Sequence, residues 1–434
     1  MSAYLDAPAA PAVSAAPPLA APLAVLGTDV AVPLADGTEV PYAALDYAAS
    51  APALQRVWDD VAAYAPYYGS VHRGAGYLSR LSTDLFEASR RTVAEFLGCR
   101  EDDQVVFTRS TTDSLNLLAT SLPAGCEVFV FETEHHAALL PWQRTAGVTV
   151  LDAPRTPVAA VATLEAALAG RDTAGPALVC VTGASNVTGE LWPVPELAAT
   201  AHRHGARIVL DAAQLVPHLP VDVAALDVDW VAFSGHKLYA PFGAGVLAGR
   251  ADWLRDAAPY LAGGGATRRV VRSDDGGVDV DWNVDDSRHE AGSPNVIGAY
   301  AIASACRALT EAGFENLAAR EQALLGRLTS ALGELPRVRV LSLFGEGAHR
   351  VGVLSFVVEG RDSAAFAAEL SDRYGIGVRD GLFCAHPLVR LLTGGDDDAV
   401  CGGGPLNAVR VSFGAGTPEE HVERFVTAVR ELTA

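Results

Sequence analysis

The stretch that decides the fold is DAAQLVPHLPVDVAALDVDWVAFSGHK, residues 211–237. An apolar run over residues 206–210 precedes it, and a second apolar run covers residues 228–233. Both runs are short, β-branched or aromatic, and bounded by turn residues, a pattern that predicts strands buried in a parallel sheet. In open α/β sheets, ligands bind beyond the carboxyl ends of the strands, so we expect Asp211 and Lys237 to face one pocket.

An acid and an amine in one pocket suit pyridoxal phosphate (PLP). A lysine amine can bond to the PLP aldehyde, and an aspartate keeps the pyridine nitrogen protonated so that the ring accepts electrons. Either residue alone is more often a helix cap or a solvated charge. The spacing between them, and the tetrapeptide Ser-Gly-His-Lys at residues 234–237, favour the cofactor interpretation.

The composition narrows the class of protein. The chain has 434 residues, enough for two or three domains with large cores. No window of about 18 apolar residues lacks charge or proline, so no membrane-spanning helix is expected. The net charge of −20 argues against nucleic-acid and anionic-membrane partners. The six cysteines form no CxxC pair, which fits a reducing cytoplasm better than a disulfide framework or a metal site.

Alternating strand and helix patterns over residues 104–249 predict a mostly parallel sheet with right-handed crossovers. An Ala/Pro-rich tail over residues 1–40 is expected to be largely disordered. We expect a large cofactor-binding domain over residues 41–295 and a smaller α+β domain over residues 296–434.

Three further segments place polar side chains at the ends of predicted strands. Residues 109–112 (RSTT) open a helix, whose free N–H groups and hydroxyls can bind an anion. The strand over residues 127–131 runs into residues 132–136 (ETEHH), where the paired histidines lack a third ligand for zinc. Asn186 follows another strand, in a turn that favours asparagine without any function.

The sequences DAAQ and SGHKLYAPFGAGVL resemble the class V aminotransferase group of PLP enzymes, and within it the Suf-type cysteine desulfurases and selenocysteine lyases. The resemblance covers roughly residue 44 to the C-terminus. It implies an α/β fold of PLP fold-type I, similar to aspartate aminotransferase, with a large and a small domain. The family motif Glu-Ala-Gly-Thr-Pro-Asn matches residues 290–295 with Ser293 in place of threonine. Because that hydroxyl reaches the partner's phosphate, the resemblance implies a homodimer with shared active sites.

The resemblance also implies the cofactor contacts. His135 is expected to stack on the PLP ring, Asn186 to lie near the ring hydroxyl and the substrate carboxylate, and Gln214 to bond to that hydroxyl. Asp211 holds the ring nitrogen and Lys237 carries the cofactor. The implied phosphate ligands are Thr111, Thr112, Ser234, His236 and Ser293 of the partner subunit.

Residues 379–387 (RDGLFCAHP) decide the chemistry. A lone cysteine is most often a small buried apolar residue, but Cys384 matches the nucleophile of the family segment Val-Arg-x-Gly-x-x-Cys-Ala-x-Pro. Arg410 matches the arginine that binds the substrate α-carboxylate, for which a planar guanidinium offers two parallel hydrogen bonds. Further substrate contacts are expected at Arg379, Asn186, His72 and Arg73.

The implied activity is PLP-dependent desulfuration of L-cysteine, which leaves L-alanine and a persulfide on Cys384, with Lys237 as the base at Cα. Two features depart from the family. Leu382 and Phe383 replace a pair that is often His-His, and the acidic, glycine-rich stretch over residues 390–407, with Cys401 inside it, is longer than expected.

Other functions stay open at this point. One is a different class V reaction on an amino acid, by a C–S lyase, a cysteine sulfinate or selenocysteine lyase, an aminotransferase or an epimerase. Another is a non-catalytic scaffold that binds a partner. The desulfurase interpretation carries further expectations, which are a sulfur-acceptor protein as partner, a cytoplasmic location and no metal.

Overall fold

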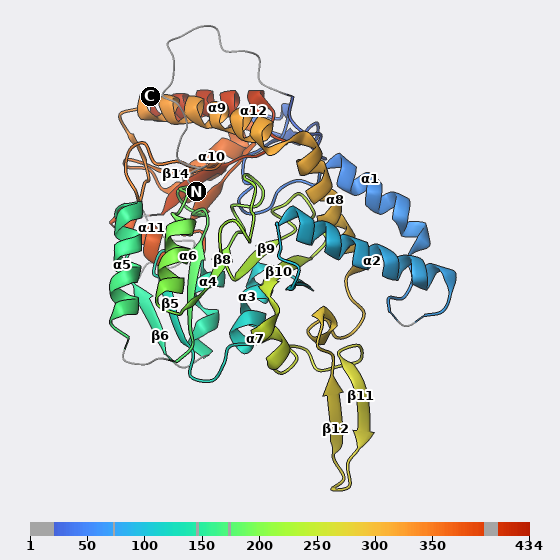
Figure 1. Cartoon of the computed structure of the whole chain (residues 1–434). Coiled ribbons are helices and arrows are strands. Elements are labelled where there is room, and N and C mark those ends of the chain that lie inside the picture. Colours follow the sequence, from blue (N-terminus) through green and yellow to red (C-terminus); the bar gives the residue numbers. More distant parts are fainter. Residues whose placement is uncertain (1–20, 73, 145–146, 172–174, 395–406) are drawn as a thin grey trace.

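The computed structural model describes residues 21–72, 74–144, 147–171, 175–394 and 407–434. The strands of its central sheet are β4 (Asp103–Thr108), β5 (Glu127–Phe131), β6 (Val148–Leu151), β7 (Ala177–Thr182), β8 (Arg207–Asp211), β9 (Trp230–Ser234) and β10 (Gly245–Arg250). These strands lie in the order β4-β10-β9-β8-β7-β5-β6 (Figure 1). The pairs β5–β6, β5–β7, β7–β8 and β8–β9 are parallel, whereas β10 runs antiparallel to β4 and β9. The prediction of a mostly parallel sheet is confirmed.

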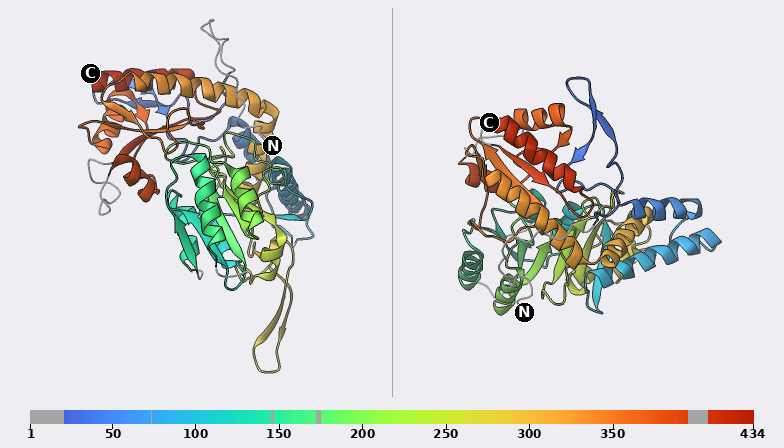
Figure 2. Two further views of the ribbon diagram at one scale, coloured as in Figure 1. Left: turned by 60° about the vertical axis from the view of Figure 1, so that its left-hand side comes forward. Right: turned by 90° about the horizontal axis from the view of Figure 1, so that it is seen from above.

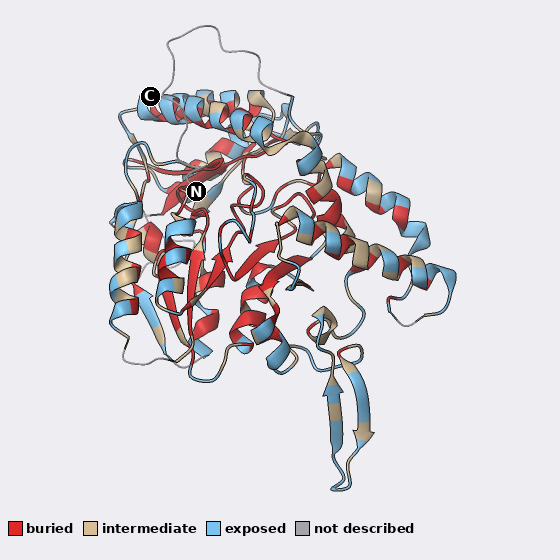
Figure 3. Ribbon diagram, viewed as in Figure 1, coloured by how far each residue is buried: buried red, intermediate tan, exposed pale blue. Residues whose placement is uncertain are grey.

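Alternate residues of the central strands enter two different cores, because successive side chains of a strand point to opposite faces. On β7, Val179 packs in the core that contains Leu164 and Leu197 from covering helices. Its neighbour Cys180 packs in the core that contains Leu118. Inner strands of the sheet such as β8 and β9 are therefore buried on both faces, as Figure 3 shows, which explains their continuous apolar runs, whereas the edge strand β6 is partly exposed.

Helices on both faces of the sheet and around it complete the large domain. They are α1 (Gln55–Tyr64), α2 (Tyr77–Phe96), α3 (Thr111–Thr120), α4 (His136–Leu139), α5 (Pro157–Ala169), α6 (Val194–Arg203), α7 (Ala251–Asp256) and α8 (Val296–Ala312), with the 3-10 turns η1 (Ala65–Tyr67), η2 (Pro141–Arg144) and η3 (Asp286–Arg288).

The small domain contains a four-stranded antiparallel sheet. Its strands are β13 (Val338–Val340), β14 (Val353–Val358), β16 (Arg379–Gly381) and β17 (Ala408–Ser412). They lie in the order β13-β14-β17-β16. The helices of this domain are α9 (Phe314–Gly333), α10 (Ser363–Tyr374), α11 (His386–Thr393) and α12 (Glu419–Thr433). A short parallel pair joins β15 (Ile376–Gly377) to β3 (Ala43–Ala44), so the chain before the large domain is docked on the small one.

The structure differs from the disordered tail expected over residues 1–40 in the second half of that segment, and residues 1–20 lie outside the described residues. Residues 21–40 are ordered and contain the hairpin of β1 (Ala31–Pro33) and β2 (Glu39–Pro41). The Leu23 N–H donates to the carbonyl of Ala415, and Val25 is buried in the main core. Apolar anchors within an Ala/Pro-rich sequence therefore tie this segment to the C-terminal part of the chain.

The domain boundary also lies later than residue 296. Ala301, Ile302 and Leu309 of α8 are buried in the core of the large sheet, whereas the core of the small domain draws on α9 from Leu324 onward. The two helices are separated at Gly313, whose φ of 79° suits glycine. A helical pattern alone does not reveal which of two cores a helix joins.

One hairpin extends away from both domains (Figure 2). It consists of β11 (Thr267–Arg272) and β12 (Val278–Trp282), and its Val270 and Val278 are exposed. Among the helices that the structure describes, none is both long enough and apolar enough to cross a membrane.

Candidate active site

A cavity of about 320 Å³ lies at the carboxyl ends of the central strands, between the two domains. Its volume falls at the low end of the range of small-molecule sites, roughly 300–1,000 Å³. The cavity brings together most of the site residues that the sequence predicts: Thr111, Thr112, His135, Asn186, Asp211, Gln214, Ser234, His236, Lys237, Arg379, Cys384 and Arg410.

Asp211 and Lys237 come from neighbouring parallel strands. Asp211 ends β8, and Lys237 follows the end of β9 by three residues. Burial lowers the pKa of the Lys237 amine to about 8, while the charge of Asp211 opposes this change. Burial also raises the pKa of Asp211, against a hydrogen bond from the Ala213 N–H and the charge of Lys237. Lys237 is the only lysine in the sequence, so no other side chain of the chain can bond to an aldehyde through an amine.

The N-terminus of α3 forms an anion cradle above these strands. Ser110 caps the helix, and its Oγ accepts the N–H of Asp113 at 3.3 Å. The hydroxyl of Ser234, from β9, accepts the Thr111 N–H at 2.7 Å and lies 2.7 Å from the Thr111 hydroxyl. A Cβ added at Gly245 would lie 2.7 Å from the backbone of Ser110, so glycine lets β10 approach the cradle. Hydroxyls and N–H groups at a helix N-terminus are donors that suit a phosphate.

His135 is fixed as a neutral ring on the cavity wall. Its Nδ1 accepts the Ala137 N–H at 3.0 Å. Burial lowers its pKa to about 3, with further lowering by the charges of Lys237 and Arg410. A neutral ring in a fixed orientation can stack on a planar cofactor without adding charge.

Two amide side chains connect the cavity to other segments. The Gln214 Nε2 donates to the carbonyl of Ala48 at 2.7 Å, and the Asn186 Nδ2 donates to the carbonyl of Phe383 at 2.8 Å. The second bond ties the turn of Asn186 in the large domain to the cysteine loop of the small domain.

Cys384 is exposed on a loop with unusual backbone geometry. Phe383 and Cys384 have φ values of 50° and 53°, a left-handed conformation that costs energy for residues other than glycine. The carbonyl of Cys384 accepts the His136 N–H at 2.7 Å. With the Asn186 bond, two hydrogen bonds from the large domain therefore hold this loop at the cavity.

Arg410 projects from β17 and is almost fully buried. Its Nη2 donates to Asp46 Oδ1 at 2.8 Å and its Nη1 to the carbonyl of Asn186 at 3.1 Å. The Phe383 ring lies over the guanidinium. Arg379 is the direct partner of Arg410 in the β16–β17 register. Two guanidinium groups thus border the cavity beside Cys384, where they could bind a carboxylate.

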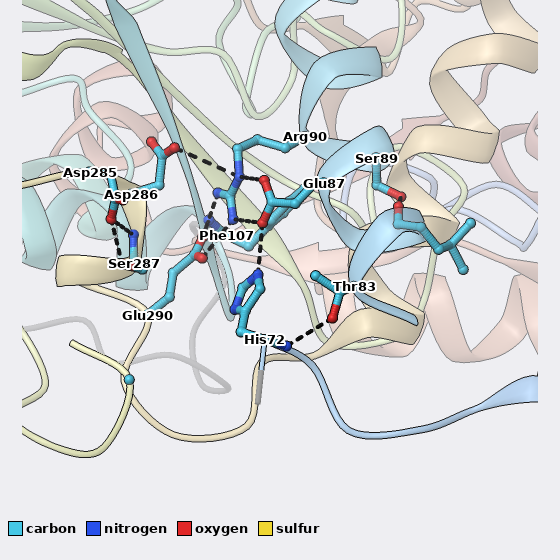
Figure 4. Close-up of polar contacts among 12 residues, drawn as sticks. His72, Thr83, Glu87, Ser89, Arg90, Phe107, Asp285, Asp286, Ser287 and Glu290 are labelled. Carbon is cyan, nitrogen blue, oxygen red and sulfur yellow. Dashed lines mark hydrogen bonds and ion pairs between the residues drawn. The ribbon is translucent and has the colours of Figure 1, made fainter. Parts of the chain in front are cut away.

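The structure does not bring His72 to the cavity of its own chain. Figure 4 shows it in a charged cluster instead, with its Nε2 2.9 Å from Glu87 Oε1. Arg90 also pairs with Glu87, and with Glu290 at 2.8 Å, in the same cluster. Ser293 is exposed and does not line the cavity. Arg73 and Cys401 lie outside the described residues.

Sequence analysis missed two carboxylates. Asp46 pairs with Arg410 across 364 positions of sequence, and a lone aspartate gives no signal of such a partner. Glu134 is fully buried, accepts the Thr182 N–H at 3.0 Å, and leaves its Oε2 without a hydrogen-bond partner among the described residues. Burial, and next the charge of Asp211, raises its pKa well above the ordinary value. Its position next to His135 was the only available clue.

These residues fit PLP. An amine and an acid lie on adjacent strands, a cradle of N–H groups and hydroxyls faces them, and a neutral ring completes the wall. No group of three His, Cys, Asp or Glu side chains in the described parts of the chain could hold a metal ion.

Comparisons with known proteins agree with this arrangement. Residues 43–425 match the family described as aminotransferase class-V. A probable cysteine desulfurase of Vibrio cholerae is 36% identical over 90% of this chain and 93% of its own length. A cysteine desulfurase of Yersinia pestis is 37% identical over 80% of this chain and 86% of its own length.

Solved structures give the same result. A cysteine desulfurase from Thermococcus onnurineus has a TM-score of 0.79 and 33% identity, and the match covers 90% of this chain and 94% of that one. A cysteine desulfurase from Escherichia coli has a TM-score of 0.77 and 30% identity, and the match covers 91% of this chain and 96% of that one.

Proposed function

The chain belongs to the aminotransferase class-V family, and from that premise we propose that it is a cysteine desulfurase that converts L-cysteine to L-alanine. The family match and the desulfurase relatives confirm the predicted fold class, the PLP cofactor and the prediction of a PLP-dependent enzyme. One observation carries the proposal from the family to the reaction, which is that Lys237, Arg410 and Cys384 line a single cavity.

Lys237 and Asp211 are the residues that would hold the reactive part of the cofactor. PLP, when bound, supplies an aldehyde that bonds to an amine and a ring that accepts electrons. Asp211 would keep a proton on the ring nitrogen, the cradle of Thr111, Thr112 and Ser234 would hold the phosphate, and the neutral ring of His135 would pack against the cofactor.

Lys237 also moves the proton at the substrate Cα. Its pKa of about 8 lies close to neutral pH, so its neutral and protonated forms are both populated there. An amine with a pKa near the working pH serves well as base and as acid. Arg410 binds the α-carboxylate and thereby sets the orientation of Cα toward that amine.

Cys384 accepts the sulfur. Its thiolate attacks the sulfur of L-cysteine, a sulfur–sulfur bond forms, and the substrate Cβ–S bond breaks. The electron pair and a proton remain with the carbon product, so the products are L-alanine and Cys384 persulfide. Cys384 is exposed, which allows a sulfur-acceptor protein to reach the persulfide.

The side chains before Cys384 give the thiol an apolar neighbourhood. Leu382 and Phe383 are buried, so neither provides a polar partner. Lys237 and Arg410 both interact electrostatically with Cys384 across the cavity.

A homodimer with shared active sites is part of the proposal. Ser293 and His72 are expected site residues but lie away from the cavity of their own chain, which supports their use at the partner's site. The protruding β11–β12 hairpin offers exposed apolar side chains for the same contact.

Product analysis tests the proposal. The holoenzyme is incubated with L-cysteine, with and without a reductant, and alanine, pyruvate and sulfide are quantified. Equal amounts of alanine and transferred sulfur, with a persulfide on Cys384 before reduction, are expected. Pyruvate and ammonia would instead mean β-elimination by a C–S lyase, and the desulfurase proposal would then be wrong.

A further inference from the structure

Arg410 is closed to a substrate in this structure. The residue is 3% exposed, although it lines the cavity. Asp46, the carbonyl of Asn186 and the ring of Phe383 surround its guanidinium. Its Nε is buried and has no hydrogen-bond partner among the described residues. An unpaired buried N–H is rare, and here it belongs to the side chain that the proposed function assigns to the substrate carboxylate.

The unpaired Nε and Nη2, the nitrogen that donates to Asp46, form one edge of the guanidinium. Nε and Nη2 present parallel N–H groups, and this edge can bind a carboxylate through two hydrogen bonds. Asp46 uses Nη2 alone, through a single oxygen at 2.8 Å. A substrate carboxylate that binds Nε and Nη2 therefore lies directly beside the carboxylate of Asp46.

Of the three neighbours, Asp46 is the one with room to move. The side chain of Asp46 is 28% exposed, whereas Phe383 is 6% exposed and the carbonyl of Asn186 is part of a buried turn. Two carboxylates side by side on the same guanidinium nitrogen would also repel each other, which favours exchange over sharing.

The backbone holds Asp46 next to Arg410 independently of the ion pair. Asp46 forms a parallel bridge with Ser412, and the N–H of Ala48 donates to the Ser412 hydroxyl at 3.0 Å. Ser412 lies two residues beyond Arg410 on β17, so both side chains leave the same face of that strand. Asp46 can therefore release Nη2 and return to it without movement of the segment.

We propose that Asp46 is the internal counter-ion of Arg410 and that the substrate α-carboxylate displaces it from Nη2 when it binds Nε and Nη2. A buried guanidinium without a partner is costly, so Asp46 keeps the empty site charged and ordered. Its displacement makes the site selective, because only a ligand with a carboxylate replaces the lost ion pair. This inference rests on the proposed function for the role of Arg410.

Binding of propionate to the holoenzyme tests the inference. Propionate carries a carboxylate but no amine and no sulfur, and ethylamine serves as the matched probe without a carboxylate. Calorimetry would compare the unmodified chain with Asp46→Asn and with Glu334→Gln, which removes an exposed ion pair with Arg430 far from the cavity.

Asp46→Asn is expected to tighten propionate binding by about tenfold, because the competing carboxylate is gone. Ethylamine binding and the Glu334→Gln variant should be unchanged. Unchanged or weaker propionate binding in folded Asp46→Asn holoenzyme would overturn the inference, since Asp46 would then orient Arg410 rather than compete for it.

A crystal structure of the unmodified holoenzyme with propionate provides a test that needs no variant. The propionate carboxylate should occupy Nε and Nη2, with Asp46 beyond hydrogen-bond distance. Asp46 still bound to Nη2 would overturn the inference. Neither measurement involves sulfur, so a failure here is distinguishable from a failure of the desulfurase proposal, which appears in the products formed from L-cysteine.

Discussion

The guanidinium carbon of Arg410 lies 5.0 Å from the centroid of the Phe383 ring, and Phe383 directly precedes Cys384. The carbonyl of Phe383 accepts the Asn186 amide, and the carbonyl of Asn186 accepts Arg410 Nη1. These three residues form a closed set of contacts from both domains. In the proposed reaction, these contacts fix the position of the sulfur-accepting Cys384 relative to Arg410, which binds the substrate carboxylate.

We expect Phe383→Ala to lower kcat/KM for L-cysteine by about tenfold, because a cation–π contact of roughly 1–2 kcal/mol is lost beside the substrate site. The loss should raise KM, since Arg410 then binds the carboxylate less well. Phe383→Tyr keeps the ring and should behave like the unmodified enzyme. Steady-state kinetics of both variants measure this, and equal losses in the two would show that ring stacking is not the cause.

Cys384→Ala should abolish sulfur transfer and leave cofactor binding unchanged. No other described cysteine is exposed, and burial raises the pKa of the half-buried Cys99 thiol to about 12. Cys99→Ala is therefore the matched control, with normal turnover expected. Alanine formation and cofactor absorbance are the two measurements. Full turnover by Cys384→Ala would remove this residue from the mechanism.

Lys237 offers an unusually clean test, because the sequence contains no second lysine. Borohydride reduction of the holoenzyme, followed by peptide mapping, should find the cofactor mass on the peptide with Lys237. Lys237→Ala should lose this covalent attachment and at least about a thousandfold of the activity. Cofactor attached to any other position would contradict the assignment of the anchor.

Sequence alone predicted the groups at the carboxyl ends of the strands well, because strand ends of a parallel sheet meet at one edge. Asp211 and Lys237 could be placed in the site from local sequence patterns and this rule alone. Asp46 could not be found in that way, since its contact with Arg410 depends on how the N-terminal segment docks on β17. The same docking explains why residues 21–40 are ordered despite their composition. His72 resembled a site residue in sequence, but within its own chain Glu87 binds it away from the cavity.

Glu134 gives a prediction about stability and pH. Burial raises its pKa, so the native state keeps its proton at pH values where the unfolded chain has lost it. Above the ordinary value of 4.5 the native state binds more protons, and stability contributed by this group falls as pH rises toward the native pKa. A glutamine side chain does not lose a proton in this pH range, so Glu134→Gln removes this pH dependence of stability. Its amide oxygen can still accept the Thr182 N–H.

The stability of Glu134→Gln relative to the unmodified holoenzyme should therefore increase between pH 5 and pH 8 by about 1 kcal/mol. Melting temperatures of the two proteins, measured across this pH range, would show the increase. Glu101→Gln, at an exposed carboxylate, should show a constant difference over the same range. A pH-independent difference for Glu134→Gln would mean that Glu134 is ionised in the native state. Asp211 and Glu134 would then both carry negative charges in the buried wall of the cavity. Another group would have to offset the second charge next to Asp211.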